Sequence, residues 1–369
     1  MKIGRVQRAR VVLGLVFFYS QGLAAANLPE SRADAMYHFY TGDKVEVSGP
    51  ALLVGKDILD SLAINGSYYV DNISSASVDV RTYGSPYKDT RTQYGFGLDY
   101  LYKDSLMSLA GSKSGEKDYQ AKTLDTGVAV EFFGGMSTVN LGYSRGFDTV
   151  GKRDTQLAAD LDRNSYRLGW TQILTSSLIS NISYEAVTEE GYLNNPYRLV
   201  KFGGQFTIEE ENHYPRTRSS QAVAIRGILN FTETYSSSIR LDYRYFWDTW
   251  EISAHTVSAT YNFYLSRQML LDAHYKWYSQ SKASFYNDNF AKTFNYMARD
   301  KELSTFSNNA LGVKVGYQLN ENPMGIFNRL SFNVAFDFIR FDYNDFTGST
   351  GKPFSFDASV FQFFLSAWF

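Results

Sequence analysis

The sequence predicts an all-β fold, a transmembrane antiparallel β-barrel, and three observations carry this prediction. Aromatic residues make up 17% of the chain although its mean hydropathy is −0.30. Apolar and polar residues alternate with a period of two in many segments, and the last nine residues carry the same alternation. An aromatic-rich chain that is not hydrophobic on average suits strands with one face in lipid and the other in water.

The C-terminal segment predicts the closing strand of such a barrel. Its apolar side chains occupy every second position and therefore share one face of a strand. A soluble chain normally ends in a frayed and polar segment. The pattern resembles the terminal strand of bacterial outer-membrane barrels, which the barrel-assembly machinery reads. The predicted assembly signal consists of Phe361, Phe363, Leu365, Ala367 and Phe369.

The N-terminal segment predicts export from the cytoplasm. Lys2, Arg5, Arg8 and Arg10 precede a short apolar run at residues 11–19, and three alanines at 24–26 offer a small-residue cleavage pattern. These features predict a secretory signal peptide over residues 1–26. The apolar run is shorter than the about 20 residues of a spanning helix. We expect one barrel domain over residues 27–369, with no room for a plug domain before its first strand.

The alternation predicts about 16 strands, an even number that leaves both termini in the periplasm. In residues 239–245, for example, Leu241 and Tyr243 alternate with Asp242 and Arg244. The first strand is the weakest, and 14 strands is the second choice. Connections alternate between short and long, which places short turns in the periplasm and long loops outside. The predicted strands are 33–41, 44–57, 60–77, 90–103, 105–116, 120–133, 136–149, 162–175, 177–191, 217–233, 235–249, 252–265, 267–282, 303–320, 328–343 and 354–369.

Composition and motifs give little reason to expect an enzyme, a cofactor or a metal site. The absence of cysteine excludes disulfides and thiolate metal sites. A formal net charge of −2 gives no basic surface for nucleic acid. The chain has four histidines and no HExxH, GxSxG or phosphate-loop motif. Glutamates at 185, 189, 190 and 209–211 could together bind Ca²⁺, but a solvated acidic loop is the favoured interpretation.

Charged residues within the strands are predicted to face the lumen, because a charge facing lipid near the midplane costs about 2–4 kcal/mol. They either pair with one another and fill the barrel or line an aqueous path. A 16-stranded barrel is wide enough for water, so we expect a passive channel or a pore for a small solute. Asp272 and His274 lie two residues apart on this face and are expected to hydrogen-bond. The candidate lumen residues are Asp71, Asp99, Arg167, Arg226, Arg240, Asp242, Arg244, Asp272, His274, Lys276, Lys314 and Asp337.

Several ordered polar segments resemble an outer-membrane family catalogued as domain of unknown function 3570. They are YYVD (68–71), SSASVD (74–79), SPYK (85–88), GYSRGFD (142–148), DRNSYR (162–167) and YEAVTEEGYLNNPYR (184–198). The resemblance extends from Tyr37 to the C-terminus. It implies a barrel in the outer membrane of a Gram-negative bacterium, surrounded by outer-membrane lipid and lipopolysaccharide, and assigns no activity to any residue. Grouping of the family with flavin-attaching and thioredoxin-like exported proteins implies an alternative, a structural sleeve for a periplasmic redox partner.

Overall fold

The structure is a computed structural model. It describes residues 27–75, 87–152, 155–194, 196–206, 213–231, 236–319, 325–348 and 351–369. The predicted signal peptide, residues 1–26, lies outside the described residues, and so do residues 209–211 of the predicted acidic cluster.

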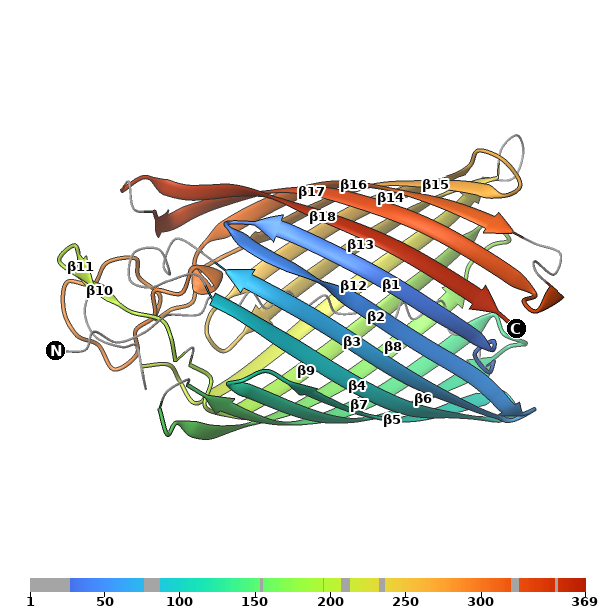
Figure 1. Ribbon diagram of the computed structural model, residues 1–369, viewed down its shortest axis with the longest axis horizontal. Helices are drawn as coiled ribbons and strands as arrows, with labels where there is room; N and C mark the ends of the chain where they lie inside the picture. Colours follow the sequence, from blue (N-terminus) through green and yellow to red (C-terminus); the bar gives the residue numbers. More distant parts are fainter. Residues whose placement is uncertain are drawn as a thin grey trace.

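In the described part of the chain, sixteen antiparallel strands close into one barrel (Figure 1). The predicted strand number is therefore confirmed, and the second choice of 14 is wrong. The weakly predicted first strand, β1 (Arg32–Gly42), pairs over its whole length with β2 (Val45–Leu59) on one side and β18 (Pro353–Trp368) on the other. Strands that are consecutive in the barrel follow one another in sequence, and β9 lies beside β12. The other barrel strands are β3 (Leu62–Ser75), β4 (Tyr87–Tyr102), β5 (Ser105–Gly115), β6 (Tyr119–Phe132), β7 (Ser137–Gly151), β8 (Ala158–Ile173), β9 (Leu178–Gly191), β12 (Thr217–Phe231), β13 (Ser237–Asp248), β14 (Ser253–Tyr264), β15 (Met269–Gln280), β16 (Phe306–Leu319) and β17 (Arg329–Thr347).

The two faces of each strand differ in the way that the alternation predicts. On β13, Leu241 and Tyr243 are exposed on the outer surface, and the residues that follow each of them, Asp242 and Arg244, lie on the inner face. On β16, Leu311 has 62% of its surface exposed. Shifting a strand by one residue would exchange its two faces, and would place these charges in lipid. The lipid therefore specifies the register strongly.

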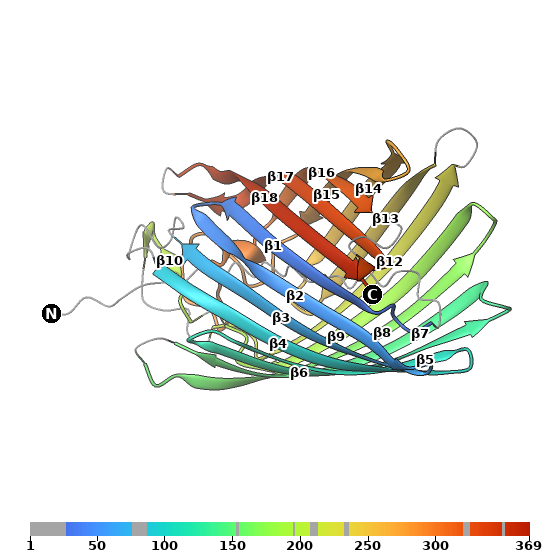
Figure 2. The same cartoon turned by 45° about the vertical axis from the view of Figure 1, so that its right-hand side comes forward.

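The two ends of the barrel have different connections. At the short-turn end the chain reverses at residues 60–61, 103–104 and 133–136, for example. At the long-loop end the connections include the one between β9 and β12 and the one between β15 and β16, whose described residues gather at the left of Figures 1 and 2. The C-terminus lies at the short-turn end (Figure 1). Outer-membrane barrels keep short turns in the periplasm and longer loops outside, which makes the long-loop end the extracellular one.

Several strands extend further toward the long-loop end than predicted. β17 runs to Thr347 instead of residue 343, and β8 begins at Ala158 instead of residue 162. At this end the outward face of β17 turns polar, with Arg340 paired to Asp342 at 3.2 Å. The alternation that marks a lipid-facing strand fades there, although the backbone ladder continues.

The strand predicted from residue 303 begins instead at Phe306. The preceding residues form a 3₁₀ turn, η1 (Lys301–Leu303), in which the Asp300 side chain accepts a hydrogen bond from the Glu302 amide. A second small element, β10 (Lys201–Phe202) with β11 (Gln205–Phe206), lies in the connection between β9 and β12. No helix in the described part of the chain is both long and apolar enough to cross a membrane.

The C-terminal strand closes the barrel by pairing with β1 and β17. Phe361, Phe363 and Leu365 are exposed on its outer face, and the smaller Ala367 is buried. The amide of Phe369 donates to the Ser31 carbonyl at 3.2 Å. The apolar stripe is thus presented outward on the strand that completes the ring.

We expect Phe369→Ser to lower the amount of folded barrel in the outer membrane several-fold, because it removes the terminal aromatic residue of this stripe. Heat-modifiable migration on gels measures the folded fraction. Phe364→Ser is the matched control, since Phe364 lies on the opposite face of the same strand. Equal loss in both variants, or none in Phe369→Ser, would contradict a role for the stripe as an assembly signal.

Candidate functional site

Every candidate lumen residue lies on the strand face opposite to the exposed apolar side chains. Around β12, β13 and β14 the charges form a band of alternating sign. The Asp242 carboxylate lies between two guanidinium groups, those of Arg226 and of Arg240, whose Nε is 3.1 Å away. Arg244 Nη2 lies 3.5 Å from Glu185 Oε2. Arg240 also donates to the Thr260 hydroxyl at 3.2 Å.

On β15, β16 and β17 the pairing differs from the expectation. His274 Nε2 lies 2.6 Å from Asp337 Oδ1, and Lys314 Nζ lies 2.6 Å from Asp272 Oδ2. The expected hydrogen bond between His274 and Asp272 is therefore wrong. Gly312 stands directly between His274 and Asp337 in the sheet. A Cβ on Gly312 would lie 2.2 Å from Asp337 Oδ1 and 2.3 Å from His274 Cε1. Because glycine has no Cβ, the His274 and Asp337 side chains can meet across the strand that lies between them.

The remaining candidates lie on other parts of the wall. Arg167 Nη2 lies 3.3 Å from Asp125 Oδ1, and Asp99 accepts from the Asn65 amide at 3.2 Å. Lys276 lies on the inner face opposite Ser258 and Ala310 in register.

The sequence analysis missed the partner of Asp71. His38 Nε2 lies 2.8 Å from Asp71 Oδ1, and the His38 ring stacks on Tyr69 at 5.1 Å between centroids. His38 is completely buried. The exposed neighbours Tyr37 and Phe39 are the alternation signal that places it inward.

Many inward-facing charged side chains remain accessible to solvent. The exposed fraction of the side chain is 49% for Arg167, 40% for Arg240 and 39% for Arg244. Side chains that filled the interior as a packed core would be buried instead. The inner wall of β8 and β13 therefore borders space that water can occupy.

At the long-loop end two connections fold over the opening (Figures 1 and 2). We call their described residues, which are 192–194, 196–206 and 213–216 of the first connection and 281–305 of the second, the mouth loops. They hydrogen-bond to each other through the Met297 amide and the His213 carbonyl at 2.9 Å, and through the Phe290 amide and the Lys201 carbonyl at 2.7 Å. A buried apolar cluster joins them to the β13–β14 connection. It contains Tyr214, Trp250, Ile252, Ala283, Phe285, Tyr286, Ala298 and Leu303.

One buried ion pair and one hydrogen bond from a buried arginine attach the second mouth loop to distant parts of the rim. Lys301 Nζ binds Asp43 in the β1–β2 turn, and its ammonium lies 5.1 Å from the centroid of the Phe356 ring. Arg299 binds Asp288 at 2.9 Å and donates to the Thr347 carbonyl at 2.9 Å.

Arg198 of the first mouth loop forms ion pairs with the second mouth loop. Arg198 lies 3.5 Å from Asp300 and 3.3 Å from Glu302. Burial alone would raise the pKa of Asp300, but Arg198 and the hydrogen bonds from Glu302 outweigh burial and hold this pKa below its usual value. Asp300 is therefore a carboxylate at neutral pH.

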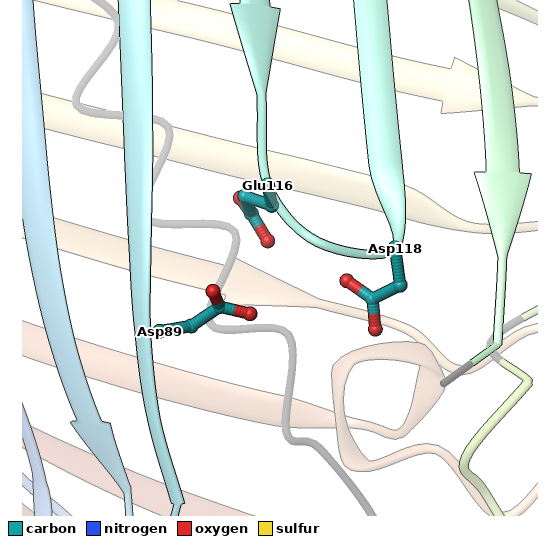
Figure 3. Close-up of side chains that lie close together, drawn as sticks. All are labelled: Asp89, Glu116 and Asp118. Carbon is teal, nitrogen blue, oxygen red and sulfur yellow. The ribbon is translucent and has the colours of Figure 1, made fainter. Parts of the chain in front are cut away.

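Three carboxylates gather beneath the mouth loops, at the ends of β4, β5 and β6. Oxygen atoms of Asp89, Glu116 and Asp118 lie within 4.8 Å of one another (Figure 3). The Tyr197 hydroxyl, from the first mouth loop, donates to Asp118 at 2.5 Å. Ca²⁺ takes about six to eight oxygen ligands, and three carboxylates with one oxygen already engaged do not identify such a site.

The acidic cluster that the sequence suggested is not formed by its described members. Glu185 pairs with Arg244 and Glu189 with Arg163, whose Nε lies 2.9 Å from the Glu189 carboxylate. Glu190 is exposed. These glutamates are therefore partners in the wall rather than ligands of one ion.

Comparison with known families gives one match, which extends over most of the chain. The family described as "Protein of unknown function (DUF3570)" matches residues 65–166 and 154–342. A search of curated proteins found no match.

Several solved structures match the chain at low sequence identity. A "Bacterial polysaccharide outer membrane secretin" superposes with a TM-score of 0.53 and 8% identity, covering 93% of this chain and 100% of that one. OpdK of Pseudomonas aeruginosa, solved with vanillate, has a TM-score of 0.45 and 9% identity, covering 91% and 98% of the two chains. OmpT of Vibrio cholerae has a TM-score of 0.45 and 10% identity, covering 92% and 96%. The first likeness shows the barrel fold of bacterial outer-membrane proteins.

Proposed function

From the premise that the chain belongs to the family of unknown function DUF3570 and is an outer-membrane β-barrel, we propose that it is a passive channel for a small solute. The observation that carries this proposal is the accessibility of the inward-facing charges. Arg167 and Arg240 face the interior, yet 49% and 40% of their side chains are exposed. A barrel that served only as a packed scaffold would gain nothing from keeping water against these charges.

The mouth loops support a channel that selects by size. They lie across the opening and are held by a buried apolar cluster, by the ion pair of Arg198 with Asp300 between the two loops, and by the ion pair of Lys301 with Asp43 on the rim. A wide barrel with such a restricted entrance suits a solute smaller than the barrel itself. Charges of both signs line the wall, so the solute is polar and hydrated, and the wall gives no reason for it to be strongly charged.

Planar-bilayer recording of the purified barrel tests the proposal directly. We expect discrete, long-lived current steps in symmetrical salt without any added partner. Liposome swelling in neutral sugars of increasing size should then show entry of small sugars and exclusion of larger ones. Protein that has been denatured and not refolded is the control for leakage caused by detergent or aggregates.

Absence of both current steps and sugar entry from correctly folded barrels would contradict the channel. The alternative is a structural sleeve for a periplasmic redox partner, and the two candidates predict different behaviour. A channel stays open by itself, whereas a sleeve would carry electrons outward only with its partner in place. Electron transfer across proteoliposomes that depends on an added periplasmic redox protein would favour the sleeve.

A further inference from the structure

Two lysines lie directly opposite each other on the outer face of the β5–β6 hairpin. Lys113 and Lys122 are register partners, and both are exposed. They share this face with Leu109 and Leu124, which have 48% and 52% of their surface exposed. The two cations therefore project away from the barrel, at the end of the hairpin that faces the long loops.

Like charges that stand directly opposite in a sheet destabilise it, and no carboxylate offsets this pair among the described residues. The carboxylates of Glu116 and Asp118, in the same hairpin, gather with Asp89 instead (Figure 3). Glu116 and Asp118 thus lie together beside Asp89, while Lys113 and Lys122 face outward.

Other outward-facing cations at this end do have carboxylate partners. Arg145 lies 2.9 Å from Asp162, and Arg340 lies 3.0 Å from Asp357. Because these cations are balanced within the protein, the positive charge of Lys113 and Lys122 is a local feature of β5 and β6.

The lysines lie at the edge of the lipid-facing surface that is nearer the long-loop end of the barrel. Tyr94 is the register partner of Lys113 on β4, and Phe147 is the register partner of Lys122 on β7. Both aromatic side chains are more than half exposed. Aromatic residues of outer-membrane barrels concentrate at the two interfaces of the bilayer, and lysine extends its ammonium from an apolar surface into the polar layer.

We propose that Lys113 and Lys122 bind a phosphate of lipid A, the anchor of lipopolysaccharide in the outer leaflet. The phosphate lies between the two ammonium groups and cancels their repulsion, and lysine binds phosphate as a point charge. Tyr94 and Phe147 flank the two lysines, and Leu109 and Leu124, which lie nearer the short-turn end of the hairpin, contact the acyl chains below the phosphate. The site therefore takes a ligand with a phosphorylated headgroup and an apolar body.

Native mass spectrometry of the full barrel titrated with lipid A tests this site. Lys113→Gln with Lys122→Gln removes both charges and keeps side chains of similar length. We expect the apparent Kd for lipid A to rise on the order of tenfold. The Lys113→Arg, Lys122→Arg double variant should retain binding. Lys103→Gln is the matched control, because Lys103 is an exposed lysine at the short-turn end of β4.

Two further lipids identify what the lysines recognise. Chemically dephosphorylated lipid A should bind the wild type as weakly as intact lipid A binds the double glutamine variant. Equal lipid A binding by the wild type and that variant would overturn the site. Phosphatidylglycerol that binds as tightly as lipid A, with the same dependence on the lysines, would overturn the assignment to lipid A. Circular dichroism and heat-modifiable migration verify that each variant is folded.

Discussion

Lys301→Glu is expected to raise the single-channel conductance by releasing the second mouth loop from the rim. Lys301 and Asp43 are both buried, with 8% and 6% of their side chains exposed. The substitution replaces a buried attraction by two opposed carboxylates. It also removes the ammonium that lies 5.4 Å and 5.1 Å from the ring centroids of Phe354 and Phe356.

The expected effect is large, because breaking a buried ion pair from one side costs about 3–5 kcal/mol. Each 1.4 kcal/mol is about tenfold in an equilibrium, so the balance between a packed and a released loop moves by at least about a hundredfold. The apolar cluster, which includes Phe285, Ala298 and Leu303, still packs on both sides of Lys301. We therefore expect the barrel to stay folded while the segment that carries Lys301 loosens from the rim.

Two measurements separate release of the loop from a general loss of structure. Conductance per channel should rise, and limited proteolysis should cut within residues 281–305 faster than in the wild type. Lys292→Glu is the matched control, because it makes the same charge change at an exposed lysine of the same loop. A Lys301→Glu barrel with unchanged conductance and unchanged resistance to protease would refute the idea that the loop restricts the entrance.

The barrel itself could be predicted because lipid acts on every strand in the same way. A strand such as β13 must place Leu241 and Tyr243 outward and Asp242 and Arg244 inward, and a period of two in the sequence records this requirement. The same alternation predicted β1, where the outward Tyr37 and Phe39 stand on either side of the inward His38. Strand ends were less well predicted, because beyond the lipid the outer face of β17 becomes polar at Arg340.

The partners of the inward charges could not be predicted from their own strands. His274 can pair with Asp337 only because Gly312, on the strand between them, has no side chain. The contacts of the mouth loops were even harder to predict, because the ion pair between Lys301 and Asp43 joins residues that are 258 positions apart in the sequence. No periodic pattern in the sequence links residues of two different loops, since such loops meet only because the closed barrel brings the ends of their strands together.

Arg240→Glu combined with Arg244→Glu is expected to shift the channel toward cations while leaving the barrel folded. Both guanidinium groups face the interior, with 40% and 39% of their side chains exposed. Asp242 keeps Arg226 as a partner after the change, and the new carboxylate at position 244 faces Glu185. The net charge of one stretch of wall that water reaches therefore becomes more negative by four units.

The reversal potential in a tenfold salt gradient measures the shift, and about 59 mV is the limit for a perfectly selective pore carrying single charges. We expect the double variant to move toward the cation limit relative to the wild type. Arg145→Glu with Arg340→Glu is the matched control, because it makes the same charge change on the outer surface. These outer charges are screened over about 8 Å at physiological ionic strength and should leave the potential unchanged. A folded, conducting Arg240→Glu, Arg244→Glu barrel with an unchanged reversal potential would show that the current bypasses β13, and the solute path would then lie against another part of the wall.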